Sequence, residues 1–125
     1  MKWIIATVIT GFLLSCGPNA EKREEKQASG ADFTKSSDYK EGLALVAENR
    51  CLVCHSISDR LTGPSYKEIA RMYAGYPDSI VSHLADRIIR GGNGVWGEVR
   101  MTPHPKVSKE EAGKMVRYIL LLDKE

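Results

Sequence analysis

Two cysteines and a histidine stand within five residues of one another in the stretch CLVCH, as Cys51, Cys54 and His55. A Cys-x-x-Cys pair of this kind is compatible with three sites: a redox-active dithiol, half of a zinc site, or a covalent attachment point for haem. Each site needs a different structure around it, so the rest of the sequence discriminates between them.

The dithiol and zinc interpretations lack the features that they require. A thioredoxin-like dithiol needs a βαβ unit, and the chain shows no sustained strand-like alternation of apolar and polar residues. A structural zinc site needs four ligands, but His83 and His104 are not at a standard spacing from the motif. The haem interpretation uses the whole motif, because cysteines at positions i and i+3 lie on one side of a helical turn and His55 then comes under the iron.

The N-terminal segment is expected to contain a targeting signal and a flexible tether. Lys2 precedes an apolar run over residues 3–14 that is too short to span a bilayer. The ending Leu-Leu-Ser-Cys at Cys16 resembles the lipobox of bacterial lipoproteins; the alternative is an ordinary signal peptide or a buried helix with an incidental cysteine. We therefore expect a lipoprotein signal peptide over 1–15, a lipid on Cys16 that anchors the protein to a membrane, and a flexible linker over 16–37.

The folded part, residues 38–125, is expected to be all-α. The net charge of +2 gives no basic field for nucleic acid. Helices are predicted over 38–50, over 65–74, from Asp78 as N-cap to the glycines at 91, and from the capping box at Ser108 and Glu111. Four glycines and two prolines in residues 91–107 predict an irregular, functional loop.

A six-coordinate haem needs a second axial ligand, and methionine is the one that raises the reduction potential. The candidates are Met72, Met101 and Met115. Met72 and Met115 stand at helix positions that also fit the apolar core, whereas no helical stripe accounts for Met101 in the long loop. Met101 is therefore the favoured ligand.

Residues 42–122 resemble the small bacterial class I cytochromes c, in particular the cytochrome c-551/c-552 group, because several motifs follow one another in the order typical of that family. They are the CLVCH motif and the stretches at 61–66, 87–92 and 94–97. The resemblance implies about four helices wrapped around one haem c, attached through Cys51 and Cys54. It also implies that the carbonyl of Pro64 accepts a hydrogen bond from His55, that Arg87 and Trp96 contact a haem propionate, and that His55 and Met101 ligate the iron.

The sequence departs from the family pattern at two places. Many members read Met-Pro-x-Asn after the ligand, whereas this chain has His104, which could replace a hydrogen bond, compete for the iron or simply face solvent. His83 is expected on the surface. The first helix has Gly42 and Val46 where an aromatic residue is common, so a lighter contact with the last helix at Tyr118 is expected.

The resemblance implies a monohaem electron carrier and not an enzyme, with other redox proteins as partners and no open iron position. The alternatives are a haem enzyme or sensor with an open distal position, or a cytochrome subunit of a larger oxidoreductase. The expected location is the bacterial periplasm, with the lipid on Cys16 in a membrane; Gly17 favours the outer membrane.

Overall fold

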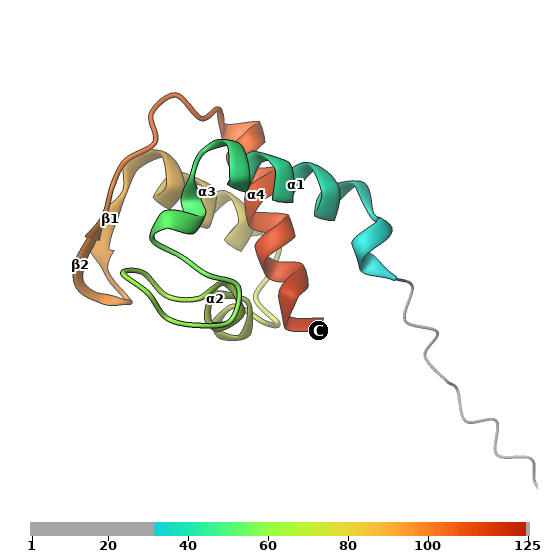
Figure 1. Cartoon of the computed structure of the whole chain (residues 1–125), viewed down its shortest axis with the longest axis horizontal. Coiled ribbons are helices and arrows are strands. Elements are labelled where there is room, and N and C mark those ends of the chain that lie inside the picture. The colour runs from blue at the N-terminus through green and yellow to red at the C-terminus, as the bar shows by residue number, and fades with distance from the viewer. Residues whose placement is uncertain (1–31, 125) are drawn as a thin grey trace, which may run out of the picture.

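The computed structural model of the chain describes residues 32–124, so the expected signal peptide, the lipid-bearing Cys16 and most of the linker lie outside the described residues. Figure 1 shows the fold, which is mainly helical with four helices, as predicted. The elements in chain order are η1 (Phe33–Lys35), α1 (Ser37–Glu48), η2 (Cys51–Val53), α2 (Tyr66–Met72), α3 (Ser79–Arg90), β1 (Gly92–Gly94), β2 (Gly97–Met101), α4 (Lys109–Leu121) and η3 (Leu122–Lys124).

Serine side chains begin three of the four helices. Ser65 and Ser108 each form a full capping box, in which the serine accepts from the N3 amide and a glutamate accepts from the serine amide. Ser36 caps α1 by accepting from Tyr39 N. Asp78 is the N-cap residue of α3, as predicted, but it has helical dihedrals and its side chain makes no capping hydrogen bond.

Helix α4 forms the centre of the core and packs against α1, α3 and α2. Gly42 allows α1 and α4 to cross closely, because a Cβ at this position would lie 2.6 Å from the carbonyl oxygen of Lys114. The expectation of a lighter contact considered only positions 42 and 46, and the structure has an aromatic contact from another position of α1. Tyr39, one turn before Gly42, packs edge-on against Tyr118 with ring centroids 5.1 Å apart, and Phe33 of η1 packs on Tyr39 in turn.

The segment after α3 contains a β-hairpin, so the prediction that residues 91–107 form no regular element is wrong for its first half. Strands β1 and β2 pair antiparallel, with Gly92 opposite Met101 and Gly94 opposite Gly97 around a two-residue turn. All three of these glycines have a positive φ, which other residues rarely adopt. The glycines that suggested a loop thus permit the turn.

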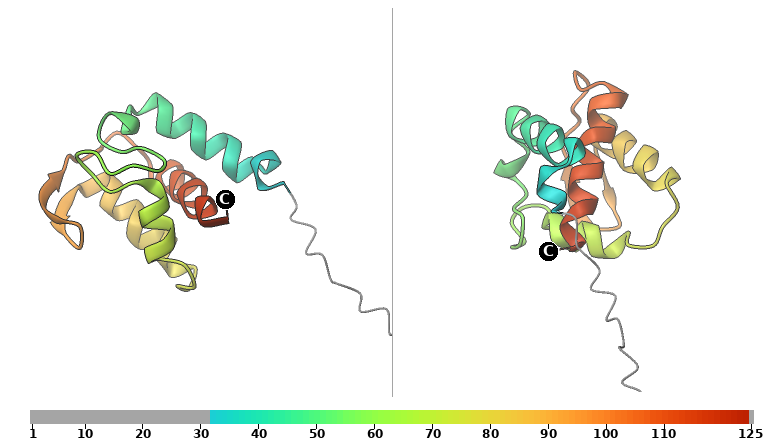
Figure 2. Two further views of the ribbon diagram at one scale, coloured as in Figure 1. Left: turned by 60° about the horizontal axis from the view of Figure 1, so that its bottom comes forward. Right: turned by 90° about the vertical axis from the view of Figure 1, so that its right-hand side faces the viewer.

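The hairpin lies at the opposite end of the molecule from η1, as the views in Figures 1 and 2 agree. Within residues 32–124, no helix is both long enough and apolar enough to cross a membrane.

Candidate functional site

A cavity opens between the CLVCH turn, α3, α4 and the hairpin, with an empty volume of about 1030 Å³ including its mouth. It collects residues from segments that are far apart in the sequence. Its wall is largely aliphatic, from Val46, Ile69, Leu84, Ile88, Val116 and Ile119. Six of the seven site residues predicted within the folded part line it: Cys51, His55, Pro64, Arg87, Trp96 and Met101.

The seventh predicted residue, Cys54, is exposed beside the cavity, whereas Cys51 is half-buried. A single turn holds the motif together, because the amides of Cys54 and His55 both donate to the carbonyl oxygen of Cys51, at 3.2 and 3.1 Å. Arg50 enters this turn with a left-handed φ of 57°. Burial raises the pKa of the Cys51 thiol. No disulfide joins Cys51 and Cys54, so the two sulfurs of one turn are available for covalent attachment.

Three neighbours fix the orientation of the His55 ring. Its Nδ1 donates to the carbonyl oxygen of Pro64 at 2.7 Å, and the ring stacks on buried Tyr66 with centroids 5.5 Å apart and planes at 22°. Gly63 passes under the ring, since a Cβ there would lie 2.6 Å from Cε1 of His55. The Nδ1 bond leaves Nε2 as the nitrogen that can bind a metal ion. Sequence reasoning assigned no role to Gly63 or Tyr66, although both lie within two residues of Pro64.

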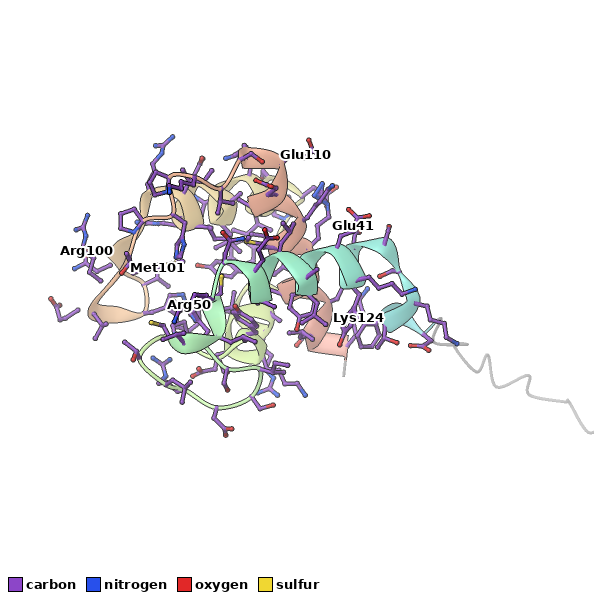
Figure 3. The ribbon with its side chains drawn as sticks, turned by 45° about the horizontal axis from the view of Figure 1, so that its top comes forward. Glu41, Arg50, Arg100, Met101, Glu110 and Lys124 are labelled. Atoms are coloured by element: carbon purple, nitrogen blue, oxygen red, sulfur yellow. The ribbon has the colours of Figure 1, made fainter. Side chains whose placement is uncertain are left out.

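Met101 is the half-buried last residue of β2 and lines the cavity. Its backbone is held against the end of α3, where a Cβ on Gly91 would overlap the carbonyl oxygen of Met101. The amide of His104 donates to the carbonyl oxygens of Ile88 and Ile89 at 3.1 and 3.2 Å, which ties the loop after β2 to the same helix. Figure 3 shows Met101 and Arg100 at the hairpin, with Arg50 on the neighbouring turn before η2.

The other candidate ligands differ in where they lie relative to the cavity. His104 is half-buried but does not line the cavity, whereas exposed His83 does. Met115 is buried in the core, as predicted, and contributes to the cavity wall. The core prediction for Met72 is wrong, because α2 ends there and the side chain is 43% exposed. The cavity thus contains the nitrogen donor His55 and the sulfur donor Met101 from two different segments, and His83 and Met115 also lie on its wall.

One edge of the cavity is polar. Arg87 lies over the hairpin backbone, since a Cβ on Gly92 would be 2.7 Å from its Nη1. Trp96 in the hairpin turn lines the same cavity, and the guanidinium of Arg60 lies 5.7 Å from the centre of its ring. Sequence reasoning missed Arg60.

These residues fit haem by their chemistry. The flat apolar body of haem suits the aliphatic wall, and its carboxylates suit the edge with Arg87 and Trp96. The two thiols of the protein can attach haem covalently, and an imidazole and a thioether can bind its iron. The fold and this site define a small c-type cytochrome.

Comparisons with known proteins agree with this class. Residues 39–123 match the family model described as cytochrome c, and the chain belongs to the cytochrome c family. It is 42% identical over 79 residues to cytochrome c-551 of Azotobacter vinelandii, covering 63% of this chain and 94% of the relative. It is 31% identical over 117 residues to cytochrome c-551 of Pseudomonas aeruginosa, covering 94% and 92%.

A solved structure extends the likeness to three dimensions. The crystal structure of Nitrosomonas europaea cytochrome c552 matches with a TM-score of 0.61 at 36% identity, covering 65% of this chain and 99% of that one. The chain is thus a class I c-type cytochrome of the bacterial c-551/c-552 kind, and it binds one haem c covalently through Cys51 and Cys54.

Proposed function

We propose that this cytochrome is a monohaem electron carrier of the bacterial periplasm, with His55 and Met101 as the axial ligands of the iron and a lipid on Cys16 as its membrane anchor. Cytochromes of this group are electron-transfer proteins, and the chain is one of them and not an enzyme. A bound haem supplies one-electron chemistry at its iron. The protein supplies ligands, orientation and the surroundings of the cofactor.

The strongest support for His55 is its hydrogen bond to Pro64. Metal-binding histidines usually donate their second nitrogen to an oxygen, which fixes the tautomer and makes the ring a better ligand. The structure has this bond at 2.7 Å. Tyr66 and Gly63 hold the ring from two sides, so His55 needs no rearrangement to face the cavity.

Met101 is supported by its place on the hairpin wall of the same cavity. A thioether is a neutral, soft ligand that favours ferrous iron and raises the potential, in keeping with a carrier. The hydrogen bonds at His104 N and the packing at Gly91 hold the chain at Met101 and just after it. Two protein ligands would leave no iron position for a substrate, so the bound haem would supply electron transfer and not substrate binding.

Exposed aliphatic side chains near the site support the proposal that redox proteins are the partners. Leu52 and Val53 of η2 are 42% and 67% exposed, and Val95 and Val99 of the hairpin are 62% and 64% exposed. Such small apolar groups beside a cofactor favour brief docking with little buried surface.

The anchor rests on the sequence alone, since Cys16 lies outside the described residues. Its support is the charged start, the apolar run and the Leu-Leu-Ser-Cys ending. Two acyl chains on a lipoprotein cysteine suffice for stable attachment.

Absorption spectra of the oxidised and reduced protein test the proposal. A carrier with both axial ligands should show low-spin spectra in both states and the weak charge-transfer band of methionine bound to ferric iron. Its mass should exceed that of the chain by one haem that acid-acetone does not extract. A high-spin spectrum that changes on adding carbon monoxide would indicate an open position and a sensor or enzyme instead.

A further inference from the structure

Arg60 lies on the loop between the CLVCH motif and α2, and its side chain reaches the hairpin. Its guanidinium lies 5.7 Å from the centre of the Trp96 ring, within the range of about 6 Å at which a cation is attracted to an aromatic face. Arg60 and Trp96 are 36 residues apart by their numbering. The contact therefore joins the loop that follows His55 to the hairpin that carries Met101.

Glu68 holds the other side of the Arg60 guanidinium. Nε and Nη2 of Arg60 both donate to Oε1 of Glu68, at 3.2 and 2.9 Å. Oε2 of the same carboxylate accepts from the amide of Ser65 at 2.7 Å, which closes the capping box of α2. Glu68 stands on a helix that packs on the core, and it thus holds the guanidinium of Arg60. The same guanidinium faces Trp96.

The hairpin itself surrounds Trp96 with few large side chains. It stands in the two-residue turn between β1 and β2, whose neighbours Val95 and Gly97 are exposed, and it is only half-buried itself. The short strands include three glycines with positive φ, so the hairpin has few side chains with which to anchor its tip. A contact from outside the hairpin therefore adds to the support of this ring.

We propose that Arg60 is a positioning residue, which keeps Trp96 closed over the polar edge of the haem cavity through a path from Glu68 to Arg60 to Trp96. Arg60 acts on the cofactor through this tryptophan. The inference uses the haem cavity of the proposed function, but it does not depend on which residue is the second axial ligand. A guanidinium suits the role better than an ammonium because it is planar, less strongly hydrated, and binds a carboxylate and an aromatic face at once.

Amide hydrogen exchange of the intact ferrous protein, followed by NMR, tests the contact. Arg60→Ala should speed exchange of the hairpin amides over 92–101 by roughly two- to fivefold, the size of a cation–π attraction at an exposed site. Amides of α1 and α4 should keep their rates. Arg60→Lys should restore part of the protection. Glu68→Gln retains a side chain that can complete the capping box but removes the charge that holds Arg60, so it should give a smaller effect of the same kind.

Arg71→Ala is the matched control, since it removes an exposed arginine from α2 without touching the contact. It should leave hairpin exchange unchanged. Unchanged hairpin exchange in Arg60→Ala, or an equal acceleration in α1 and α4, would overturn the proposal, because the second result means a general loss of stability.

The reduction potential distinguishes a positioning role of Arg60 from a direct electrostatic effect of its charge on the haem. Arg60→Ala should change the potential in the wild-type background and change it much less when Trp96→Leu is already present, because the path through the ring is then gone. Equal changes in both backgrounds would mean that Arg60 acts only as a nearby charge, and would refute the positioning role. An altered axial ligand would appear separately, as loss of the methionine charge-transfer band.

Discussion

The Nδ1 of His55 donates a hydrogen bond to the backbone carbonyl of Pro64 across 2.7 Å. Because the acceptor belongs to the main chain, no side-chain substitution removes it, and the bond depends on how closely the two segments approach. Gly63 sets that approach, since it leaves room for the ring where any other residue would place a Cβ 2.6 Å from His55 Cε1.

Gly63→Ala should therefore displace the His55 ring and lengthen its bond to Pro64. We expect a loss of about 1–3 kcal/mol of stability from the forced contact. The potential should rise, because a weaker Nδ1 bond makes the imidazole less basic and stabilises ferric iron less. Guanidinium denaturation and voltammetry of the holoprotein measure the two effects. An unchanged potential would show that Gly63 does not control this bond.

Met101→Ala should abolish the methionine charge-transfer band and lower the potential, because the iron loses its soft neutral ligand. His104→Ala should retain the band, since this side chain does not line the cavity. Near-infrared absorption of the ferric variants distinguishes the two residues. Loss of the band in His104→Ala with retention in Met101→Ala would reverse the assignment.

Gly42→Ala should destabilise the holoprotein by about 1–3 kcal/mol, because the new methyl group would force α1 away from α4. Gly113→Ala in α4 is the matched control, since its Cβ would meet Arg117 Nη1 at an ordinary 3.4 Å. That substitution should stabilise the helix by up to about 1 kcal/mol. Denaturant unfolding followed by far-ultraviolet circular dichroism measures both. Equal effects of the two substitutions would contradict the close crossing.

Asp86 should contribute pH-dependent stability. Its hydrogen bond with Lys109, at 2.6 Å, together with the charges of Lys109, Arg90 and His83, lowers its pKa below the usual 3.8. A lowered carboxyl pKa stabilises the folded state above pH 3.8, and this contribution is lost as the pH falls through the lowered value. Asp86→Asn should therefore be less stable than wild type at pH 7 and equal to it in strong acid. Thermal melts across this range, with exposed Glu98→Gln as the control, test the pair.

Cys16→Ser should release the protein from membranes into the soluble periplasmic fraction, because no lipid can then be attached. Fractionation of cells that express the two forms, with haem content as the check on folding, measures the release. Unchanged membrane association of the serine variant would count against the lipid anchor.

The sequence predicted those parts of the fold that short local patterns determine. The capping box at Ser108 and the turn signals after α3 identified helix ends, and the spacing in CLVCH indicated the cofactor. The resemblance located Pro64, whose contact with His55 is present in the structure. The ligand role of Met101 stays a prediction, as do the propionate contacts of Arg87 and Trp96.

The missed features are those that depend on the path of the chain in space. The hairpin was hidden because β1 has three residues, two of them glycine, and shows no alternation. Tyr39 lies at the edge of the predicted first helix, and only the crossing with α4 shows that its ring meets Tyr118. In the sequence Arg60 is an ordinary charged loop residue, and only the fold shows that it lies beside Trp96.

The tether and the haem cavity lie at opposite ends of the domain. The described chain begins at η1, and the hairpin with Met101 lies at the far end, as Figures 1 and 2 show. Under the proposed attachment through Cys16, the tether joins the domain on the side away from the cavity. The haem edge is then free to turn toward proteins in solution or toward neighbours in the same membrane, and the anchor does not compete with them for the surface through which electrons pass.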